Sequence, residues 1–262
     1  MGYFDSHAHY WDRRFEEEWE GGADALIRAA LSSCVSGIVN VGTSPETSLL
    51  AIEQAKKYPG MFAAAGLHPS DVGGFEELEE ALAAVEALFA DPQNKLVALG
   101  EIGLDYHYEP YDKAVQLAYF HGQLELAAKI GVPVLIHDRE AHGDCYEAVC
   151  AHPDVRGVFH SYSGSAEMAR DLVARGYYIS FSGTVSFKNA RRVTEAAACV
   201  PRDRLLIETD CPYLAPHPHR GKLNHSGLLP HTAAAIAAVW GCTEEEVAAV
   251  TEENAKRFFG LA

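Results

Sequence analysis

Eight short apolar runs recur along the 262 residues of this chain, and they constrain its fold more than any other feature. Each run is rich in Val, Ile, Leu, Phe, Tyr or Ala, as expected of parallel strands covered on both faces. The runs are residues 2–7, 37–42, 61–67, 96–101, 132–137, 155–160, 177–181 and 205–208. They predict eight parallel strands.

Segments with apolar residues at helical spacing separate these runs, as in residues 75–90 and 117–128. A last helix is predicted to begin at Thr243, where Glu246 completes a capping box. Strand and helix alternating eight times predict a (β/α)₈ TIM barrel, an α/β fold of about 250 residues, as one domain over residues 1–262. A doubly wound sheet would alternate similarly, but no GxGxxG motif follows the first run.

The formal net charge of −16 excludes a large basic face of the kind that grips duplex DNA. A nucleic-acid substrate would have to be held by a few local cations and by metal. The first residues show no signal-peptide pattern, and no apolar run approaches a membrane span. The six cysteines form no CxxC motif. We therefore expect a cytoplasmic protein with reduced thiols and no membrane partner.

Polar side chains are rare within the apolar runs and frequent at their carboxyl ends. Parallel strands of a barrel end on one rim, which is where barrel enzymes place their active sites. The metal-ligating or acid–base side chains at these ends are His7, His9, His68, Glu101, His137, His160, Glu208 and Asp210. Buried carboxylates need a partner, and a metal ion is the simplest partner common to so many groups.

The sequence His7-Ala8-His9 is the most direct indication of a metal site. Side chains two residues apart on a strand point to the same face, so both imidazoles can chelate one ion. Asp5 is expected on that face, where it would orient a histidine. Glu208 and Asp210 also share a face; Asp210, farther out, is the better ligand or base, and Glu208 is either a supporting acid or a polar group buried in the barrel.

Nine sequence segments occur in an order shared with one enzyme family. They are FDSHAH (4–9), GLHP (66–69), GEIGLDYH (100–107), PVLIHDREA (133–141), FHSYSGS (159–165), SFKNA (186–190), IETDCPYLAP (207–216), HRGKLN (219–224) and ENAKRFFG (253–260). They span almost the whole chain, which resembles the TatD family of metal-dependent deoxyribonucleases in the metallo-dependent hydrolase superfamily. GEIGLDY and ETDCPYLAP together are the most specific of the matches.

The resemblance implies two divalent metal ions, with Zn, Mg and Mn as candidates. It assigns His7, His9 and Asp210 to one ion and His137 and His160 to the other. Glu101 would bridge them. Mixed imidazole and carboxylate ligands suit Zn²⁺ and Mn²⁺, whereas Mg²⁺ usually prefers oxygen.

The resemblance also implies a hydrolase that acts as an exonuclease on phosphodiester bonds, from the 3′ end of single-stranded DNA or short oligonucleotides. Two such ions can activate water and stabilise the attacking and leaving oxygens. Asp210 and Glu101 are the predicted catalytic residues, Asp210 as general base. Phosphate oxygens would be held by His68, Arg139, Lys188 and Arg220.

Three positions depart from the family's usual pattern. Tyr162 occupies a position where Phe or a similar residue is usual, His107 replaces a more usual aromatic residue, and His225-Ser226-Gly227 follows HRGKLN, where Glu-Pro is usual. We expect these positions to lie around the substrate. Two other functions stay open: the same groups could hydrolyse an amide, a lactone or another ester, or the barrel could be an inactive scaffold. Because all six predicted ligands are present, the scaffold is disfavoured.

Overall fold

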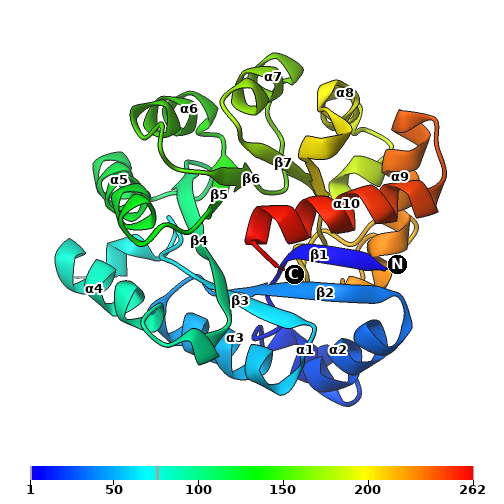
Figure 1. The fold of residues 1–262 in the computed structure, drawn as a ribbon, viewed down its shortest axis with the longest axis horizontal. Helices are drawn as coiled ribbons and strands as arrows, with labels where there is room; N and C mark the ends of the chain where they lie inside the picture. Colours follow the sequence, from blue (N-terminus) through cyan, green and yellow to red (C-terminus); the bar gives the residue numbers. More distant parts are fainter. Residues whose placement is uncertain (1, 75–76, 262) are drawn as a thin grey trace.

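The computed structural model describes residues 2–74 and 77–261. Eight parallel strands pair in sequence order, and the ribbon shows them as a ring surrounded by helices (Figure 1). The strands are β1 (Tyr3–Ala8), β2 (Val35–Val41), β3 (Met61–Ala65), β4 (Leu96–Asp105), β5 (Val134–Arg139), β6 (Gly157–Phe159), β7 (Tyr178–Phe181) and β8 (Leu205–Ile207). Every predicted run overlaps a strand, so the predicted TIM barrel is confirmed. The largest difference is β4, which continues four residues past the predicted end at Glu101.

Ten α-helices lie among the described residues and cover the outside of the ring or its base. They are α1 (Arg14–Glu18), α2 (Gly22–Ser33), α3 (Pro45–Lys57), α4 (Leu78–Leu88), α5 (Lys113–Ile130), α6 (His142–Ala151), α7 (Ala166–Ala174), α8 (Arg191–Cys199), α9 (Leu229–Trp240) and α10 (Glu244–Phe259). The helix predicted from residue 75 begins at Leu78, and residues 75–76 lie outside the described part.

The start of α10 follows its sequence signal. The Thr243 hydroxyl accepts a hydrogen bond from the Glu246 amide, and the Glu246 carboxylate accepts one from the Thr243 amide, which confirms the capping box. The helix ends at Gly260, whose φ of 68° lies in the left-handed region that favours glycine.

The barrel closes where the carboxyl ends of β8 and β1 meet. The Asp210 amide donates to the His7 carbonyl at 2.9 Å, and the His9 amide donates to the Cys211 carbonyl at 2.8 Å. The Ser6 hydroxyl adds a bond of 3.0 Å to the Ile207 carbonyl. The contacts that complete the ring therefore also bring Asp210 beside the two histidines of the first strand.

The opposite end of the barrel is filled by apolar side chains. One buried cluster takes a residue from every strand and adds Ala255, Phe258 and Phe259 from α10. The Phe4 ring of β1 stacks on Phe62 and on Phe259, with ring centroids 6.4 and 5.9 Å apart. In Figure 1, α10 crosses the middle of the ring. This helix therefore forms the floor of the barrel, away from the rim that carries the histidines.

None of the described helices is both long and apolar enough to cross a membrane. All six cysteines are free thiols, as the sequence predicts.

Candidate metal centre

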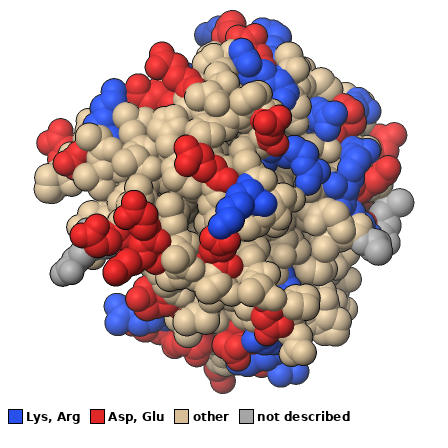
Figure 2. Space-filling view, turned by 60° about the vertical axis from the view of Figure 1, so that its left-hand side comes forward, with Lys and Arg blue, Asp and Glu red and all other residues tan. Residues whose placement is uncertain are grey.

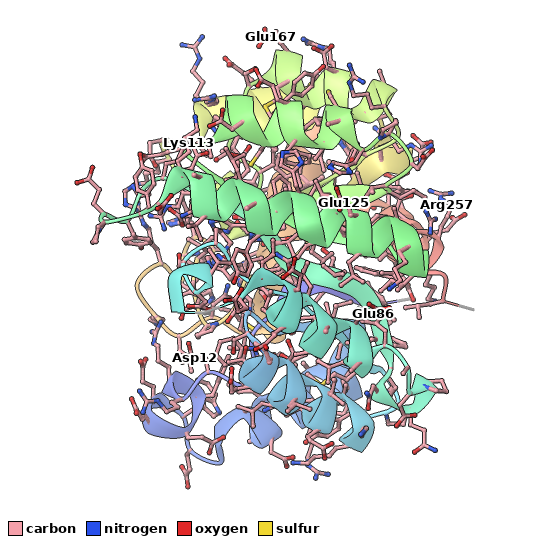
Figure 3. All side chains as sticks on the ribbon, turned by 90° about the vertical axis from the view of Figure 1, so that its left-hand side faces the viewer. Asp12, Glu86, Lys113, Glu125, Glu167 and Arg257 are labelled. Carbon is pink, nitrogen blue, oxygen red and sulfur yellow. The ribbon has the colours of Figure 1, made fainter. Side chains whose placement is uncertain are left out.

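The polar residues at the strand ends meet in a pocket of about 720 Å³ at the mouth of the barrel. Figure 3 shows the barrel from the side, with Asp12 and Lys113 at the end that carries these loops and Arg257 of α10 at the other end. Five of the six predicted metal ligands line the pocket, namely His9, Glu101, His137, His160 and Asp210. The sixth, His7, is fully buried and lies against them.

Glu101 is at the centre of this group, and its two carboxylate oxygens face different histidines. Its Oε1 atom lies 2.6 Å from His137 Nδ1 and 2.7 Å from His160 Nε2. Its Oε2 atom lies 3.3 Å from His7 Nε2 and 3.5 Å from His9 Nε2. One carboxylate thus touches both predicted ligand groups, which is the arrangement that a bridging ligand requires.

Asp210 completes the group on the side of the first strand. Its Oδ1 atom lies 3.3 Å from His9 Nε2 and 4.0 Å from His7 Nε2. The two histidine Nε2 atoms are themselves 3.2 Å apart. The His7 ring also stacks on His160 at a centroid distance of 4.1 Å. The two predicted ligand groups therefore form one continuous cluster, and within it His7, His160 and Asp210 have ligand atoms close enough to hold an ion together.

Irregular strand pairing sets the direction of two of these side chains, His7 and Glu101. The pairing of β1 with β2 shifts register between Asp5 and Ala8, and that of β4 with β5 shifts between Leu99 and Ile102. Shifts of this kind bend a strand and redirect its side chains. They enclose His7 and Glu101, and the sequence pattern gives no sign of them.

Asp5 has a different role from the one predicted. Its carboxylate accepts hydrogen bonds from the amide and hydroxyl of Thr209, from the Ser226 hydroxyl and from the His7 amide, and among the described residues no hydrogen bond joins it to a histidine ring. Burial raises the pKa of this carboxyl to about 7. The expectation that Asp5 orients a histidine is therefore wrong, because the alternation of faces does not carry across the irregular stretch of β1. Asp5 instead joins β1 to the loop after β8.

The outward nitrogen of three histidine rings is hydrogen-bonded to a fixed acceptor. His9 Nδ1 lies 2.8 Å from the Val41 carbonyl, His137 Nε2 lies 3.0 Å from Asp105 Oδ2, and His160 Nδ1 lies 3.2 Å from Glu208 Oε1. A neutral imidazole that donates from one nitrogen presents a lone pair on the other. In all three rings that second nitrogen points toward Glu101 or Asp210. A lone pair that faces a carboxylate at this distance needs a proton or a metal ion between the two groups, and this set of imidazole and carboxylate donors fits metal ions.

The charge balance of the cluster agrees with this fit. Burial alone would raise the pKa of the Glu101 carboxyl, but the fields of His160, His68 and His7 and a hydrogen bond with His137 lower it well below its usual value. Likewise, desolvation opposes ionisation of Asp105, yet the bond with His137 brings its pKa to about 2. Both carboxylates are therefore ionised at neutral pH and attract positive charge.

Asp105 supports the site although the sequence analysis predicts no role for it. It is buried at the end of the extended β4, and its Oδ2 atom fixes the His137 ring from behind. Glu208 has the corresponding role for His160 and also accepts from the Ser161 amide at 2.7 Å. The contacts of Glu208 therefore favour the interpretation that it supports a metal ligand over the interpretation that it is only a buried polar group. The sequence signal for this role is an acidic residue at the carboxyl end of the fourth apolar segment, in Gly103-Leu104-Asp105.

Replacing Asp105 with Ala is expected to lower metal affinity and hydrolytic activity by roughly 10- to 100-fold, because His137 loses its outer partner. Asp105→Asn keeps an acceptor oxygen and should lose less. Metal titration monitored by calorimetry would measure this, with the unfolding temperature recorded in parallel. Wild-type metal affinity in Asp105→Ala would contradict the role.

The predicted phosphate-binding residues separate into two sets. His68 and Arg139 line the pocket, and His68 Nε2 lies 3.5 Å from Glu101 Oε1, close enough for it to serve as a further ligand. Lys188 and Arg220 are exposed and are not among the lining residues. The Arg220 guanidinium lies over the Phe187 ring at 4.5 Å.

The three departures from the family pattern do not line the pocket. Tyr162 is buried, and its hydroxyl donates to the Ser165 carbonyl. His107 pairs with Glu140 at 2.7 Å on the surface, and His225 lies beside Trp19. Their proximity to the substrate therefore stays a prediction; of the three, His107 comes nearest the pocket, because its ring meets that of Tyr108, which lines the pocket.

Comparison with known proteins gives one consistent result. The family model described as TatD related DNase matches residues 4–260. An uncharacterized metal-dependent hydrolase of Bacillus subtilis, YabD, is 40% identical over 260 residues, covering 98% of this chain and 99% of the relative. A Cronobacter sakazakii protein named 3′-5′ ssDNA/RNA exonuclease TatD is 35% identical over 246 residues, covering 90% of this chain and 91% of the relative. The crystal structure of the TatD homologue YJJV from Escherichia coli superposes with a TM-score of 0.89 at 27% identity, covering 99% of this chain and 98% of that one.

Proposed function

Since this chain belongs to the TatD-related DNase family and is a metal-dependent hydrolase, we propose that it removes nucleotides from the 3′ end of single-stranded DNA. The observation that carries the proposal is the position of Glu101, whose two oxygens each face a separate pair of histidines. The direction of cleavage is supported by the name of the Cronobacter relative.

The described side chains offer ligands for two ions. His7, His9 and Asp210 would hold one, His137 and His160 the other, and Glu101 would contact both. Two ions in such a site activate a water molecule and stabilise the attacking and leaving oxygens of a phosphodiester. Zn²⁺ and Mn²⁺ suit this mixture of imidazole and carboxylate better than Mg²⁺ does.

The chain's own residues would position the water and the substrate. Asp210 lines the pocket and contacts His9 and His7 through its Oδ1 atom, which leaves its second oxygen to accept the proton of the water. Arg139, at the end of β5, presents a guanidinium that can bind two phosphate oxygens at once. His68 reaches the same space from the loop after β3. Lys188 and Arg220 would bind phosphates farther from the scissile bond.

Arg139→Ala is expected to lower kcat/KM on an oligonucleotide roughly 10- to 100-fold, the usual effect of losing a charged hydrogen bond. Lys188→Ala, which removes an exposed cation outside the pocket, should lower it at most about fivefold. Steady-state kinetics on one single strand would compare the two variants. Equal losses would contradict the placement of the phosphate beside Arg139.

The proposal is tested by incubating the protein with Mn²⁺, Mg²⁺ or Zn²⁺ and single strands labelled at the 5′ or the 3′ end. Exonucleolysis from the 3′ end releases a labelled mononucleotide at once from the 3′-labelled strand and produces a ladder from the 5′-labelled strand. Short internal fragments without a ladder would indicate an endonuclease. Absence of cleavage with every metal would overturn the proposal.

A metal-dependent amide or ester hydrolase is the second candidate. The observation that favours it is the charge of the surface: on the face shown in Figure 2, Lys and Arg are interspersed with Asp and Glu and form no continuous basic surface. Assays on amide and lactone substrates beside the oligonucleotide would separate the two activities. An inactive scaffold would bind no metal and hydrolyse none of these substrates.

A further inference from the structure

Two of the most exposed aromatic side chains among the described residues are located in the pocket at the mouth of the barrel. Tyr108 is 60% exposed and Tyr213 is 46% exposed, and both line the pocket. Exposing an aromatic ring to water costs free energy that burial would recover. Neither ring contributes to the metal centre, so their exposure there calls for a ligand with an aromatic or apolar face.

Tyr108 lies in the loop between β4 and α5. The Arg139 guanidinium lies over its ring at 4.6 Å, and the His107 ring meets it edge-on at 4.9 Å. One face of the ring is therefore covered by a cation, yet the side chain stays 60% exposed and lines the pocket, so ring surface remains for a ligand. A planar group that stacks there would be held beside the arginine proposed to bind phosphate.

Tyr213 lies in the loop after β8 and is fixed by its hydroxyl, which donates to Asp12 Oδ2 at 2.7 Å. The Arg14 guanidinium lies over its ring at 5.7 Å. Trp11, which also lines the pocket, is held by a bond from its indole nitrogen to the Val41 carbonyl at 2.7 Å. Tyr213 and Trp11 therefore form an aromatic surface whose side chains are already held in place by hydrogen bonds.

The two tyrosines face the metal centre from opposite sides. In a ring of eight strands joined in sequence order, β4 and β8 are diametrically opposed. In Figure 3, Asp12, the partner of Tyr213, and Lys113, which follows the loop of Tyr108, lie apart on the same end of the molecule. The cluster around Glu101 lies between them.

We infer that Tyr108 and Tyr213 are two nucleobase-binding subsites, one on each side of the scissile phosphate. This inference rests on the proposed function and extends it: the substrate is recognised through at least two unpaired bases that stack on these rings. Base stacking on aromatic side chains tolerates any sequence and needs no basic surface. It therefore explains how a chain with a net charge of −16 can hold nucleic acid. Two neighbouring bases of a duplex are stacked on each other and paired, so they cannot lie on two separate rings, and single strands are favoured.

The test uses a single strand and two derivatives in which a tetrahydrofuran unit replaces the terminal or the penultimate 3′ base. All three have the same phosphates. Removing either base is expected to lower the kcat/KM of the wild-type protein roughly 5- to 100-fold, the measured range for one stacked base. Tyr108→Ala should become insensitive to loss of one base, and Tyr213→Ala to loss of the other. Tyr108→Phe and Tyr213→Phe should keep the wild-type pattern.

Tyr111 provides the matched control. It lies in the same loop as Tyr108 and is 40% exposed, but it stacks on Tyr106 at 5.0 Å and does not line the pocket. Tyr111→Ala should respond to the abasic strands as the wild type does. If Tyr108→Ala and Tyr213→Ala also respond like the wild type, or if both lose sensitivity to the same base, the inference is overturned.

Affinity for the three strands, measured by fluorescence anisotropy, separates this inference from the proposed function. Tighter binding of the intact strand without cleavage would overturn the proposed function and support the subsites. Equal binding and equal cleavage of all three strands would support the function and overturn the subsites.

Discussion

Replacing Glu101 with Ala is expected to lower phosphodiester hydrolysis on the order of 10³-fold or more and to weaken the binding of both metal ions. The carboxylate touches both histidine pairs, so its loss removes a ligand from two ions at once. Metal ions supply several kcal/mol of transition-state stabilisation, and each 1.36 kcal/mol corresponds to about a tenfold change in rate. The measurement is kcat/KM on a 3′-labelled strand together with metal content by mass spectrometry.

Glu101→Gln distinguishes charge from shape at this position. It keeps the length of the side chain but loses the negative charge, so it should retain part of the metal and little of the activity. Because removing one partner of a buried charge cluster costs stability, circular dichroism should establish that both variants are folded before their activity is compared. Undiminished hydrolysis in Glu101→Ala would show that Glu101 does not bridge the ions.

Replacing Phe258 with Ala is expected to lower the free energy of unfolding by about 3–5 kcal/mol, the usual cost of removing a buried phenyl ring. Phe258 is buried in the floor of the barrel, where its ring lies 5.0 Å from Tyr178 and 4.9 Å from Phe259. For a chain of this size the midpoint of thermal unfolding should fall by roughly 2–4 °C for each kcal/mol. Urea unfolding followed by circular dichroism would measure the change.

Leu50 is the control for this variant, because it is apolar, helical and 53% exposed on α3. Leu50→Ala should change stability by no more than about 0.5 kcal/mol. At 25 °C the folded fraction of Phe258→Ala should keep the wild-type kcat, since the floor lies at the opposite end from the metal centre. If Phe258→Ala lost kcat but kept the wild-type stability, Phe258 would serve catalysis and not the stability of the barrel floor.

The fold follows from the sequence because its signals are local. Each strand overlaps a mainly apolar run, and helical spacing is visible in several of the segments between them, so the alternation identifies the barrel without long-range information. The position of α10 could not be read in the same way. Phe258 marks an apolar end of the helix, but only the assembled ring creates the opening that this end covers, whereas Val247 packs into the larger core cluster.

The metal ligands could be predicted for a related reason. His7, Glu101 and Asp210 occur at strand ends, and parallel strands bring their ends together whatever the details of packing. What could not be predicted is the partner of each group. Asp5 and Asp105 are both strand acids, yet one joins two strands and the other fixes a histidine, because register shifts change the direction of side chains without leaving a mark in the sequence.

The floor of the barrel has a consequence for the synthesis of the protein. Its interior takes side chains from all eight strands and from residues 255–259, so no shorter stretch of chain has a finished core. While translation proceeds, the growing polypeptide holds an open barrel with apolar side chains in contact with water until the codons for α10 have been read. Incomplete chains of this kind associate with one another readily. A premature stop before residue 255 should therefore yield an aggregating product that depends on chaperones, and not a smaller working enzyme.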